Sequence, residues 1–294
     1  MTRNPQPSRS KRAAPAAPAV HVERARPVAP LEPRVWGSTD VGRRRPGNED
    51  HHGVWTPVDV ATRERLGVLM VVADGMGGSQ SGEVASRMAV ETVIRVVSES
   101  SGEDIAGTLR HAIEEANREV HEASLQDTER NGMGTTCTAV LIRGDVAWVG
   151  HVGDSRAYLV RGNQIRQLTS DHTLVAHLVQ RREITRQQAR RDPRRNILTR
   201  SVGPQPAVEA EVFQADVHLR AGDAILLCSD GLHGYFNDSE LADMISNADP
   251  SPVVRELIAE ANDRGGADNI TAVLAYLAPA GAEAEADLPD VREA

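Results

Sequence analysis

Two short links that contain glycine place the strongest constraint on how this chain can fold. Residues 143–145 (Arg-Gly-Asp) and 161–163 (Arg-Gly-Asn) each lie between two apolar runs that read as β-strands. Links this short join antiparallel strands, because a parallel pair needs a crossover connection of about a dozen residues or more. The sequence therefore predicts a β-hairpin at each link.

Other segments carry equally clear strand and helix signals. Runs rich in β-branched and other apolar residues predict strands over residues 68–73, 136–142, 146–152, 157–160, 224–228 and 270–277. Apolar residues at helical spacing predict helices over residues 82–98 and 104–124. A capping box at Thr185 and Gln188, and the pair Ser251-Pro252, indicate two more helix starts. Together these patterns indicate an α+β fold in which helices cover antiparallel sheets.

The composition fits a globular protein better than a membrane protein or a nucleic-acid binder. Hydrophobic residues make up 40% of the 294 positions, and the formal net charge is −9. This charge argues against general binding of nucleic acid, and no apolar stretch approaches the ~20 residues that span a membrane. The N-terminus lacks an apolar signal core, so we expect a cytoplasmic protein. Cys137 and Cys228 lie in apolar runs and are expected to be buried and reduced.

The chain divides into one domain and two tails. Residues 1–32 are rich in Pro, Ala and Arg and are predicted to form a disordered basic arm. Residues 33–278 contain neither an internal repeat nor a convincing linker, so a single domain is expected there. Residues 279–294 read as an acidic disordered tail.

Acidic residues recur where a predicted strand starts or stops. The positions are Glu49 and Asp50, Asp74, Asp154, Asp230 and Asp268. One Asp-Gly pair at a strand end usually forms a turn, but several strand ends can converge on a single sheet edge. Carboxylates crowded there would repel one another and resist ionisation. Hard cations such as Mg²⁺ or Mn²⁺, which prefer oxygen ligands, would remove that repulsion.

Eight short motifs follow one another within residues 36–277. In chain order they are RPGNED, VVADGMGG, GTTCTAVLI, VGDSRAYLV, LTSDHT, NILTRSVG, ILLCSDGL and GGADNITAVL. This ordered set resembles the metal-dependent serine/threonine protein phosphatases of type 2C, especially their bacterial single-domain members. The resemblance implies a four-layer α-β-β-α sandwich, in which helices flank two central antiparallel β-sheets. It also implies two Mn²⁺ or Mg²⁺ ions, with a third in a weaker site.

The resemblance assigns the two principal metal sites to named residues. Asp74 would bridge both ions and the activated water. Glu49 and the carbonyl of Gly75 would bind one ion, and Asp230 and Asp268 would bind the other.

Further roles follow from the same resemblance. Asp154 would form the third site together with Asp230, and Asp50 and Asn269 would support the ligands from behind. Arg45 would bind the substrate phosphate, for which its guanidinium fork is suited.

The implied reaction is direct attack of a metal-activated water on phosphorus, without a covalent phosphoenzyme. The implied substrates are phosphorylated proteins, including serine/threonine protein kinases, and a monomer is expected. Animal members of the family carry a histidine where this chain has Met76, which cannot donate a proton. His172 is a substitute donor by residue type alone, and a structural role is the competing interpretation.

The resemblance also implies that residues 171–203 form a mobile flap beside a cleft that holds the metal ions. The flap is rich in arginine between Arg181 and Arg195. These side chains fit either a solvated helical face or a surface that attracts a phosphorylated protein.

Other functions compete with the interpretation as a metal-dependent protein phosphatase. Cys137 and Arg143 have the spacing of a cysteine phosphatase, but no glycine lies between them to form a phosphate cradle. GDSRA resembles a serine-nucleophile turn but lacks the closing glycine. A regulatory module without chemistry should have lost metal-binding acids, which are all present here. A phosphatase that acts on small phosphoesters stays open as an alternative.

Overall fold

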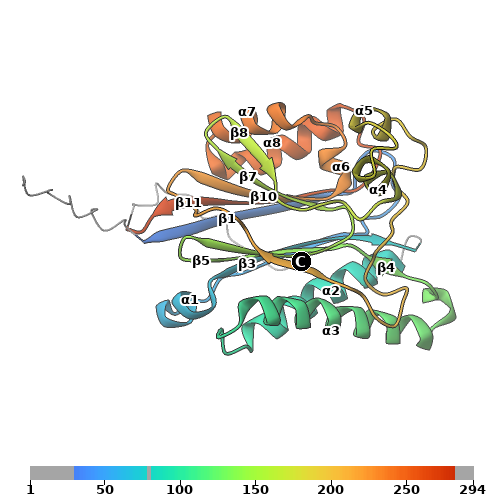
Figure 1. The fold of residues 1–294 in the computed structure, drawn as a ribbon, viewed down its shortest axis with the longest axis horizontal. Helices are drawn as coiled ribbons and strands as arrows, with labels where there is room; N and C mark the ends of the chain where they lie inside the picture. Colours follow the sequence, from blue (N-terminus) through green and yellow to red (C-terminus); the bar gives the residue numbers. More distant parts are fainter. Residues whose placement is uncertain (1–29, 78–80, 282–294) are drawn as a thin grey trace, which may run out of the picture.

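Two antiparallel β-sheets form the centre of the computed structural model, which describes residues 30–77 and 81–281 (Figure 1). The first sheet runs in the order β1 (Leu31–Asp40), β11 (Ile270–Pro279), β10 (Asp223–Cys228), β7 (Arg156–Arg161) and β8 (Gln164–Gln167). The second runs in the order β2 (Asp50–Trp55), β3 (Val68–Met76), β5 (Cys137–Arg143), β6 (Val146–Val152) and β9 (Glu211–Gln214), and β4 (Gly134–Thr135) pairs with β3.

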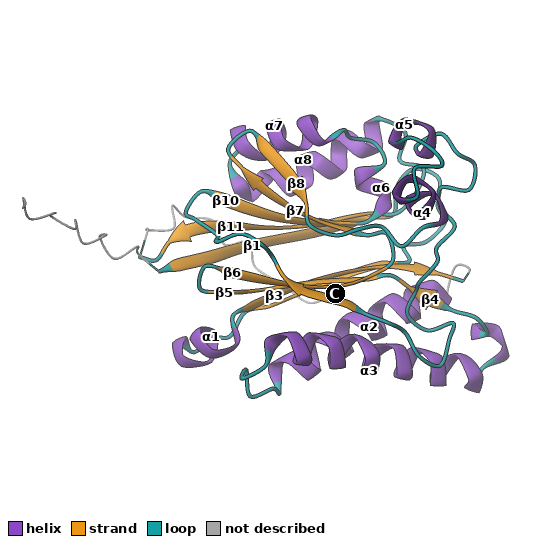
Figure 2. Ribbon diagram, in the orientation of Figure 1, coloured by secondary structure: helices purple, strands orange, loops and turns teal. Residues whose placement is uncertain are grey.

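Helices cover the outer face of each sheet (Figure 2). The second sheet is covered by α2 (Ser81–Ser98) and α3 (Ile105–Gln126), and the first by α7 (Asp238–Asn247) and α8 (Pro250–Asp263). This is the predicted four-layer α-β-β-α sandwich. Shorter helices are α1 (Val60–Leu66), α4 (Leu174–Gln180), α5 (Arg186–Ala189), α6 (Asp230–His233) and the 3-10 turn η1 (Thr128–Arg130). No helix in the described ranges is long and apolar enough to cross a membrane.

Strand β3 shows how one strand supplies two hydrophobic layers. Its alternate side chains point to opposite faces of the sheet. Leu69 and Val71 belong to the core beneath α2 and α3, whereas Met70 and Val72 belong to the core between the two sheets. All four side chains are fully buried. A continuous apolar run is therefore the sequence that this doubly covered position requires.

The first and last strands close one edge of the first sheet. β1 pairs with β11 from Leu31 opposite Pro279 to Asp40 opposite Ile270. Ordered strand thus begins ahead of the boundary predicted at residue 33 and ends just past residue 278. The remaining parts of the predicted arm and tail, residues 1–29 and 282–294, lie outside the described residues.

Most predicted elements are confirmed, and one helix start is wrong. All six predicted strands occur, and the two hairpin links join β5 to β6 and β7 to β8. The capping box of Thr185 and Gln188 is also present. Helix α8, however, starts at Pro250 with Asp249 as its N-cap, because the Asp249 side chain accepts from the Ser251 backbone N–H. The predicted pair Ser251-Pro252 therefore lies inside the first turn.

Candidate active site

A cavity of about 610 Å³ opens where the proposed site residues meet. Its described lining includes Arg45, Glu49, Asp74, Gly75, Asp154, Asp230, Asp268 and Asn269, and also Pro46, Gly47, Met76, Gly77, Thr136, Asn196, Leu198 and Ser201. Of the predicted site residues, Asp50 alone is not part of this lining. Residues from distant parts of the chain are therefore brought to one place.

Asp74 is held by its backbone inside β3, which continues past the predicted end at residue 73. Its N–H donates to the Thr136 hydroxyl at 2.9 Å, and its carbonyl accepts from the Thr136 N–H at 2.9 Å. The Thr135 hydroxyl also donates to that carbonyl, at 3.0 Å. Because the backbone groups are satisfied by neighbouring residues, the position of the Asp74 carboxylate at the cavity is fixed by the sheet.

Asp50 lies opposite Asp74 in the β2–β3 ladder and behind the cavity. One carboxylate oxygen, Oδ2, accepts from the hydroxyls of Ser229 and Thr271, each at 2.7 Å. Ser229 is the N-cap of α6, and Asp230 is the first residue of that helix. Asp50 therefore fixes the chain directly before Asp230. Its other oxygen, Oδ1, is buried without a hydrogen-bond partner among the described residues.

The carboxyl groups around the cavity resist ionisation. Burial, followed by the charges of Asp50, Asp230, Asp154 and Asp268, raises the pKa of Asp74 well above its ordinary value. Burial and the charge of Asp230 raise the pKa of Asp154 to about 7. Burial and the charge of Asp268 raise the pKa of Asp230 to about 6. Each carboxylate thus increases the cost of ionising the next.

The pKa values of two further carboxyl groups, Asp50 and Glu49, are also raised. Burial and the charges of Asp230 and Asp268 raise the pKa of Asp50 to about 7, although its two hydroxyl donors act in the opposite direction. Burial also raises the pKa of Glu49, while the charge of Arg45 lowers it. A bound cation would supply the positive charge that this crowded set lacks.

Asn269 connects the start of β11 to the loop that carries Arg45. Its Oδ1 accepts from the Glu49 N–H at 2.8 Å, and its Nδ2 donates to the carbonyls of Val41 and Gly47, both at 2.9 Å. The Arg45 guanidinium then donates to Asp268 Oδ2 at 2.7 Å. One buried amide therefore fixes both Glu49 and the loop of Arg45 beside Asp268.

Glycines allow the backbone around Glu49 to pack closely. A Cβ atom on Gly75 would collide with the carbonyl oxygens of Glu49 and Gly82, and one on Gly82 would lie 2.9 Å from Glu49 Oε2. The Ser86 hydroxyl donates to the Glu49 carbonyl at 2.6 Å. Close packing of β3 against the start of α2 thus places Glu49 at the cavity.

The donor set fits a hard divalent cation by its chemistry. The charged ligands proposed from the sequence offer oxygen alone, which suits Mg²⁺ or Mn²⁺ better than zinc. Their crowding and raised pKa values favour a cation, because a cation would compensate the negative charge that appears when these groups ionise. Within the described residues, however, no three His, Cys, Asp or Glu side chains already surround one point as ligands. The fit rests on donor chemistry and charge.

His172 does not occupy the place that a proton donor to the substrate would need. It is not among the described residues that line the cavity. Its Nδ1 accepts from the Gly153 N–H at 3.1 Å, and its Nε2 lies 3.2 Å from Glu211 Oε2. Burial lowers its pKa. These contacts favour the structural interpretation, whereas Met76 does line the cavity.

Cys137 is not placed to act as a nucleophile, in agreement with the sequence analysis. Cys137 and Arg143 lie at opposite ends of β5. The Arg143 guanidinium donates to the carbonyls of Arg65 and Gly102, away from the thiol. Burial raises the pKa of Cys137 to about 12, so the thiolate is absent at neutral pH. Both cysteines are buried and free, as predicted.

The sequence motifs predict neither the contribution of Thr136 nor which flap residues line the cavity. Thr136 is predicted only as part of a strand, although a hydroxyl inside an apolar run is a usable signal for a polar role. The flap contributes Asn196, Leu198 and Ser201. Its ends are joined, because Thr173 bridges Leu198 and the Leu174 N–H donates to the Ile197 carbonyl at 2.9 Å.

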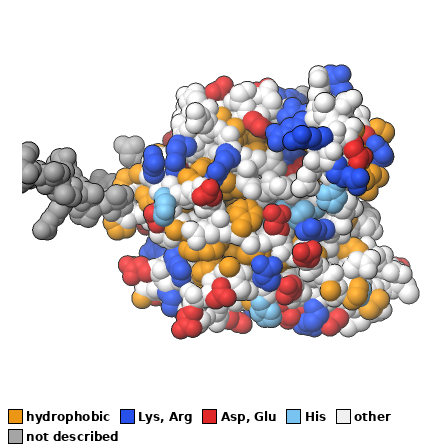
Figure 3. Space-filling view, viewed as in Figure 1, with side chains coloured by type: hydrophobic (Ala, Val, Ile, Leu, Met, Phe, Trp, Pro, Cys, Tyr) orange, Lys and Arg blue, Asp and Glu red, His pale blue; other side chains and the backbone are white. Residues whose placement is uncertain are grey.

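The flap also carries much of the positive charge on one face of the molecule. Its arginines from Arg181 to Arg195 are exposed, and Figure 3 shows basic side chains gathered over α4 and α5. Arg181 and Arg194 form ion pairs with the neighbouring acids Glu183 and Asp192. A solvated helical face and an anion-attracting surface are both consistent with this arrangement.

Comparisons with known proteins agree with the site. The family described as protein phosphatase 2C matches residues 47–275. Serine/threonine phosphatase stp of Listeria welshimeri is 39% identical over 241 residues, which cover 80% of this chain and 92% of the relative. The structure of the Streptococcus agalactiae serine/threonine phosphatase superposes with a TM-score of 0.76 at 34% identity, covering 83% of this chain and 99% of that one.

A further solved structure bears on the cofactor. The catalytic domain of the serine/threonine protein phosphatase PstP, in complex with two manganese ions, superposes with a TM-score of 0.73 at 31% identity. The match covers 84% of this chain and 99% of that one. The family match, the shared fold and the acidic cavity lead to one conclusion: the chain belongs to the protein phosphatase 2C family, whose members depend on divalent metal ions.

Proposed function

We propose that this protein hydrolyses phosphoserine and phosphothreonine in phosphorylated proteins, using divalent metal ions. The observation that carries the proposal is the cavity in which buried, mutually repelling carboxyl groups lie beside Arg45. The serine/threonine phosphatases of Listeria and Streptococcus, to which the chain is similar, support the choice of substrate.

We propose two Mn²⁺ or Mg²⁺ ions, with a third in a weaker site. Glu49 and the Gly75 carbonyl would hold one ion, Asp230 and Asp268 the other, and Asp74 both. When bound, such ions activate a water for attack on phosphorus and neutralise charge on the phosphoryl group.

The third ion would use Asp154 together with Asp230. Both side chains line the cavity, and the charge of Asp230 helps to raise the pKa of Asp154. Asp50 and Asn269 would support the ligands through the hydrogen bonds described above.

Arg45 would bind the substrate rather than an ion. Its guanidinium lies at the cavity mouth with its side chain 48% exposed, and it donates to Asp268. A phosphate monoester offers two oxygens that match this fork. Because Met76 cannot donate a proton and no histidine is present in the described lining, the leaving serine or threonine oxygen would take its proton from solvent or from a lining carboxyl group.

The oligomeric state, localisation, substrates and domain bounds predicted from the sequence are part of the proposal. We propose a monomeric, cytoplasmic enzyme that acts on phosphorylated proteins, including serine/threonine protein kinases. Its phosphatase domain, predicted over residues 33–278, would lie between a basic arm and an acidic tail. The pairing of β1 with β11, in which Leu31 lies opposite Pro279, supports these domain bounds.

The test is hydrolysis of an aryl phosphate and of a phosphothreonine peptide by the full chain. Activity should require added Mn²⁺ or Mg²⁺ and should be abolished by Asp230→Ala. Asp216→Ala is the matched control, because Asp216 is exposed and is not part of the cavity lining. Turnover in EDTA, or an active Asp230→Ala variant, would contradict the proposal. A preference for the aryl phosphate over the peptide would favour a small-phosphoester phosphatase instead.

A further inference from the structure

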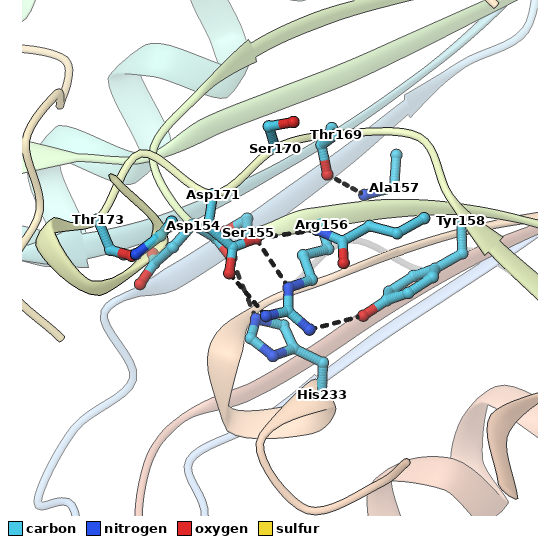
Figure 4. Close-up of polar contacts among 12 residues, drawn as sticks. Asp154, Ser155, Arg156, Ala157, Tyr158, Thr169, Ser170, Asp171, Thr173 and His233 are labelled. Atoms are coloured by element: carbon cyan, nitrogen blue, oxygen red, sulfur yellow. Dashed lines mark hydrogen bonds and ion pairs between the residues drawn. The ribbon is translucent and has the colours of Figure 1, made fainter. Parts of the chain in front are cut away.

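The guanidinium of Arg156, close to Asp154 in the chain, makes three side-chain hydrogen bonds. Arg156 is the first residue of β7 and follows Asp154 by two positions. Its Nε and Nη2 donate to Asp171 Oδ1 at 2.8 Å and Oδ2 at 2.6 Å, and its Nη1 donates to the Tyr158 hydroxyl at 3.0 Å (Figure 4). The guanidinium is therefore held on both edges, in a geometry that lysine cannot reproduce.

This ion pair is shielded from water. The side chains of Arg156 and Asp171 are 22% and 17% exposed. Burial alone would raise the pKa of Asp171, but hydrogen bonds and the charge of Arg156 hold it below its ordinary value. Gln167 Nε2 donates to Asp171 Oδ1 at 3.0 Å as a further partner. The pair thus remains charged and fixed in orientation.

Asp171 stands at the root of the flap, and the chain beside it holds both sides of the loop that carries Asp154. The His172 N–H donates to the Gly153 carbonyl at 2.7 Å, and the Gly153 N–H donates back to His172 Nδ1 at 3.1 Å. On the other side, the Ala157 N–H donates to the Thr169 hydroxyl at 3.2 Å. Asp154 therefore lies on a short loop with its ends tied to the flap root.

Two more bonds extend this unit toward the rest of the site. His233 Nε2 donates to the Asp154 carbonyl at 3.1 Å, and His233 is the last residue of α6, which begins with Asp230. At the far end of the flap, the Thr199 N–H donates to the His172 carbonyl at 2.8 Å. The loop of Asp154, the helix of Asp230 and both ends of the flap are hence joined around Arg156.

We propose that Arg156 is a positioning residue. Its paired hydrogen bonds to Asp171 (the Arg156–Asp171 fork) fix the Asp154 loop and the flap root as one unit, and they hold Asp154 at the cavity for metal binding. This inference rests on the proposed function. Without the fork, the loop keeps its backbone bonds to the flap but loses the charged contact that sets its distance from the flap root. The expected result is weaker metal binding at Asp154.

A simpler interpretation is that the ion pair of Arg156 with Asp171 only stabilises the fold. Strand β7 contains a matched control for this interpretation, the ion pair of Arg161 with Asp223. Arg161, the last residue of β7, forms the same paired contact with Asp223. Its Nε donates to Oδ1 at 2.8 Å, and its Nη2 donates to Oδ2 at 2.7 Å. The Asp223 side chain is 2% exposed. Neither Arg161 nor Asp223 is part of the described cavity lining.

The experiment compares Arg156→Lys, Asp171→Asn and Arg161→Lys in the full chain. Isothermal titration with Mn²⁺ measures metal binding without turnover, and Asp154→Asn identifies the binding event that depends on Asp154. Thermal unfolding in EDTA measures stability, and the Mn²⁺ dependence of kcat for an aryl phosphate gives a third readout. The conservative Asp171→Asn variant keeps the test valid if Arg156→Lys folds poorly.

Arg156→Lys and Asp171→Asn should each weaken the Asp154-dependent event about tenfold to a hundredfold, the usual effect of losing a group that orients a ligand. The double variant should bind Mn²⁺ no more weakly than either single variant, because both substitutions remove the same interaction. Arg161→Lys should lower the unfolding temperature similarly and leave Mn²⁺ binding unchanged.

Three outcomes would overturn the inference. Wild-type Mn²⁺ binding in Arg156→Lys and Asp171→Asn would show that the fork does not position Asp154. Equal weakening in Arg161→Lys would reduce the effect to general stability. Absence of any Asp154-dependent event would leave Arg156 no ligand to position. An inactive wild-type protein that still binds Mn²⁺ in this pattern would instead contradict only the proposed function.

Discussion

Replacing Asp154 by asparagine should stabilise the metal-free protein, although it removes a proposed metal ligand. The Asp154 side chain is buried, with the residue 9% exposed, and its pKa is raised from 3.8 to about 7. One pKa unit corresponds to about 1.4 kcal/mol, so ionising this carboxyl in the folded state costs about 4 kcal/mol more than in the unfolded chain. Asparagine keeps the shape and removes that cost.

The effect depends on pH with a definite sign. A carboxyl whose pKa is raised by folding contributes full stability below its unfolded pKa, and the contribution is lost as the pH rises toward the folded pKa. With values of 3.8 and about 7, the loss begins near pH 4 and is nearly complete at pH 8. The gain from Asp154→Asn is therefore about 2 kcal/mol at pH 5 and about 4 kcal/mol at pH 8.

Urea denaturation in EDTA at both pH values measures this difference. Asp216→Asn serves as the control, because an exposed carboxylate outside the cavity should change stability by no more than about 0.5 kcal/mol. Saturating Mn²⁺ should reverse the order, since the wild type then gains binding energy that the variant lacks. An Asp154→Asn protein that is no more stable than wild type at pH 8 in EDTA would refute the view that uncompensated charge crowds this cavity.

Two further substitutions test other parts of the site. Arg45→Ala should lower kcat/KM for a phosphothreonine peptide about tenfold to a hundredfold, as expected for losing hydrogen bonds to a charged group, and steady-state kinetics within twofold of wild type would count against a phosphate-binding role. Gly75→Ala should destabilise the protein by about 1–3 kcal/mol, because its methyl group collides with the carbonyl oxygens of Glu49 and Gly82, and unchanged urea denaturation would show that β3 has room there.

The interior strands could be predicted from the sequence because they are buried on both faces. The prediction for β6 coincides with its observed bounds, Val146–Val152, and β3, β5 and β10 show similarly continuous apolar runs. No range is predicted for β1, β2, β4, β8 and β9. Of these strands, β1, β2, β8 and β9 lie at sheet edges and are mostly only partly buried, and β4 is two residues long. β1 also contains Pro33, which edge strands tolerate but which weakens a strand pattern.

The start of α8 shows a different limit of local signals. Asp249-Pro250 and Ser251-Pro252 both offer a capping side chain followed by proline. The helix begins at the first pair, so the second proline lies in the first turn, where its missing N–H costs little. Capping chemistry alone could not choose between the two.

The site could be predicted only in pieces from local patterns. These patterns located each acid near a strand end, but the meeting of Glu49 with Asp268 depends on the order in which strands pair. Asn269 shows the reason, since its three hydrogen bonds reach back to Val41, Gly47 and Glu49. Such long-range contacts leave no periodic signal, and the family resemblance supplied what local patterns could not.

The pairing of β1 with β11 also determines where the chain can be opened or extended. The Ala280 N–H donates to the Pro30 carbonyl at 2.7 Å, so the two ends of the described domain are adjacent. From there the strands run ten residues to Asp40 and Ile270, beside the cavity, a distance of about 33 Å. A short loop joining residues 30 and 280, with new termini in the 143–145 hairpin, defines a circular permutant with the same sheets. Domains fused at residue 30 or 280 would likewise leave the entrance for a phosphorylated protein clear.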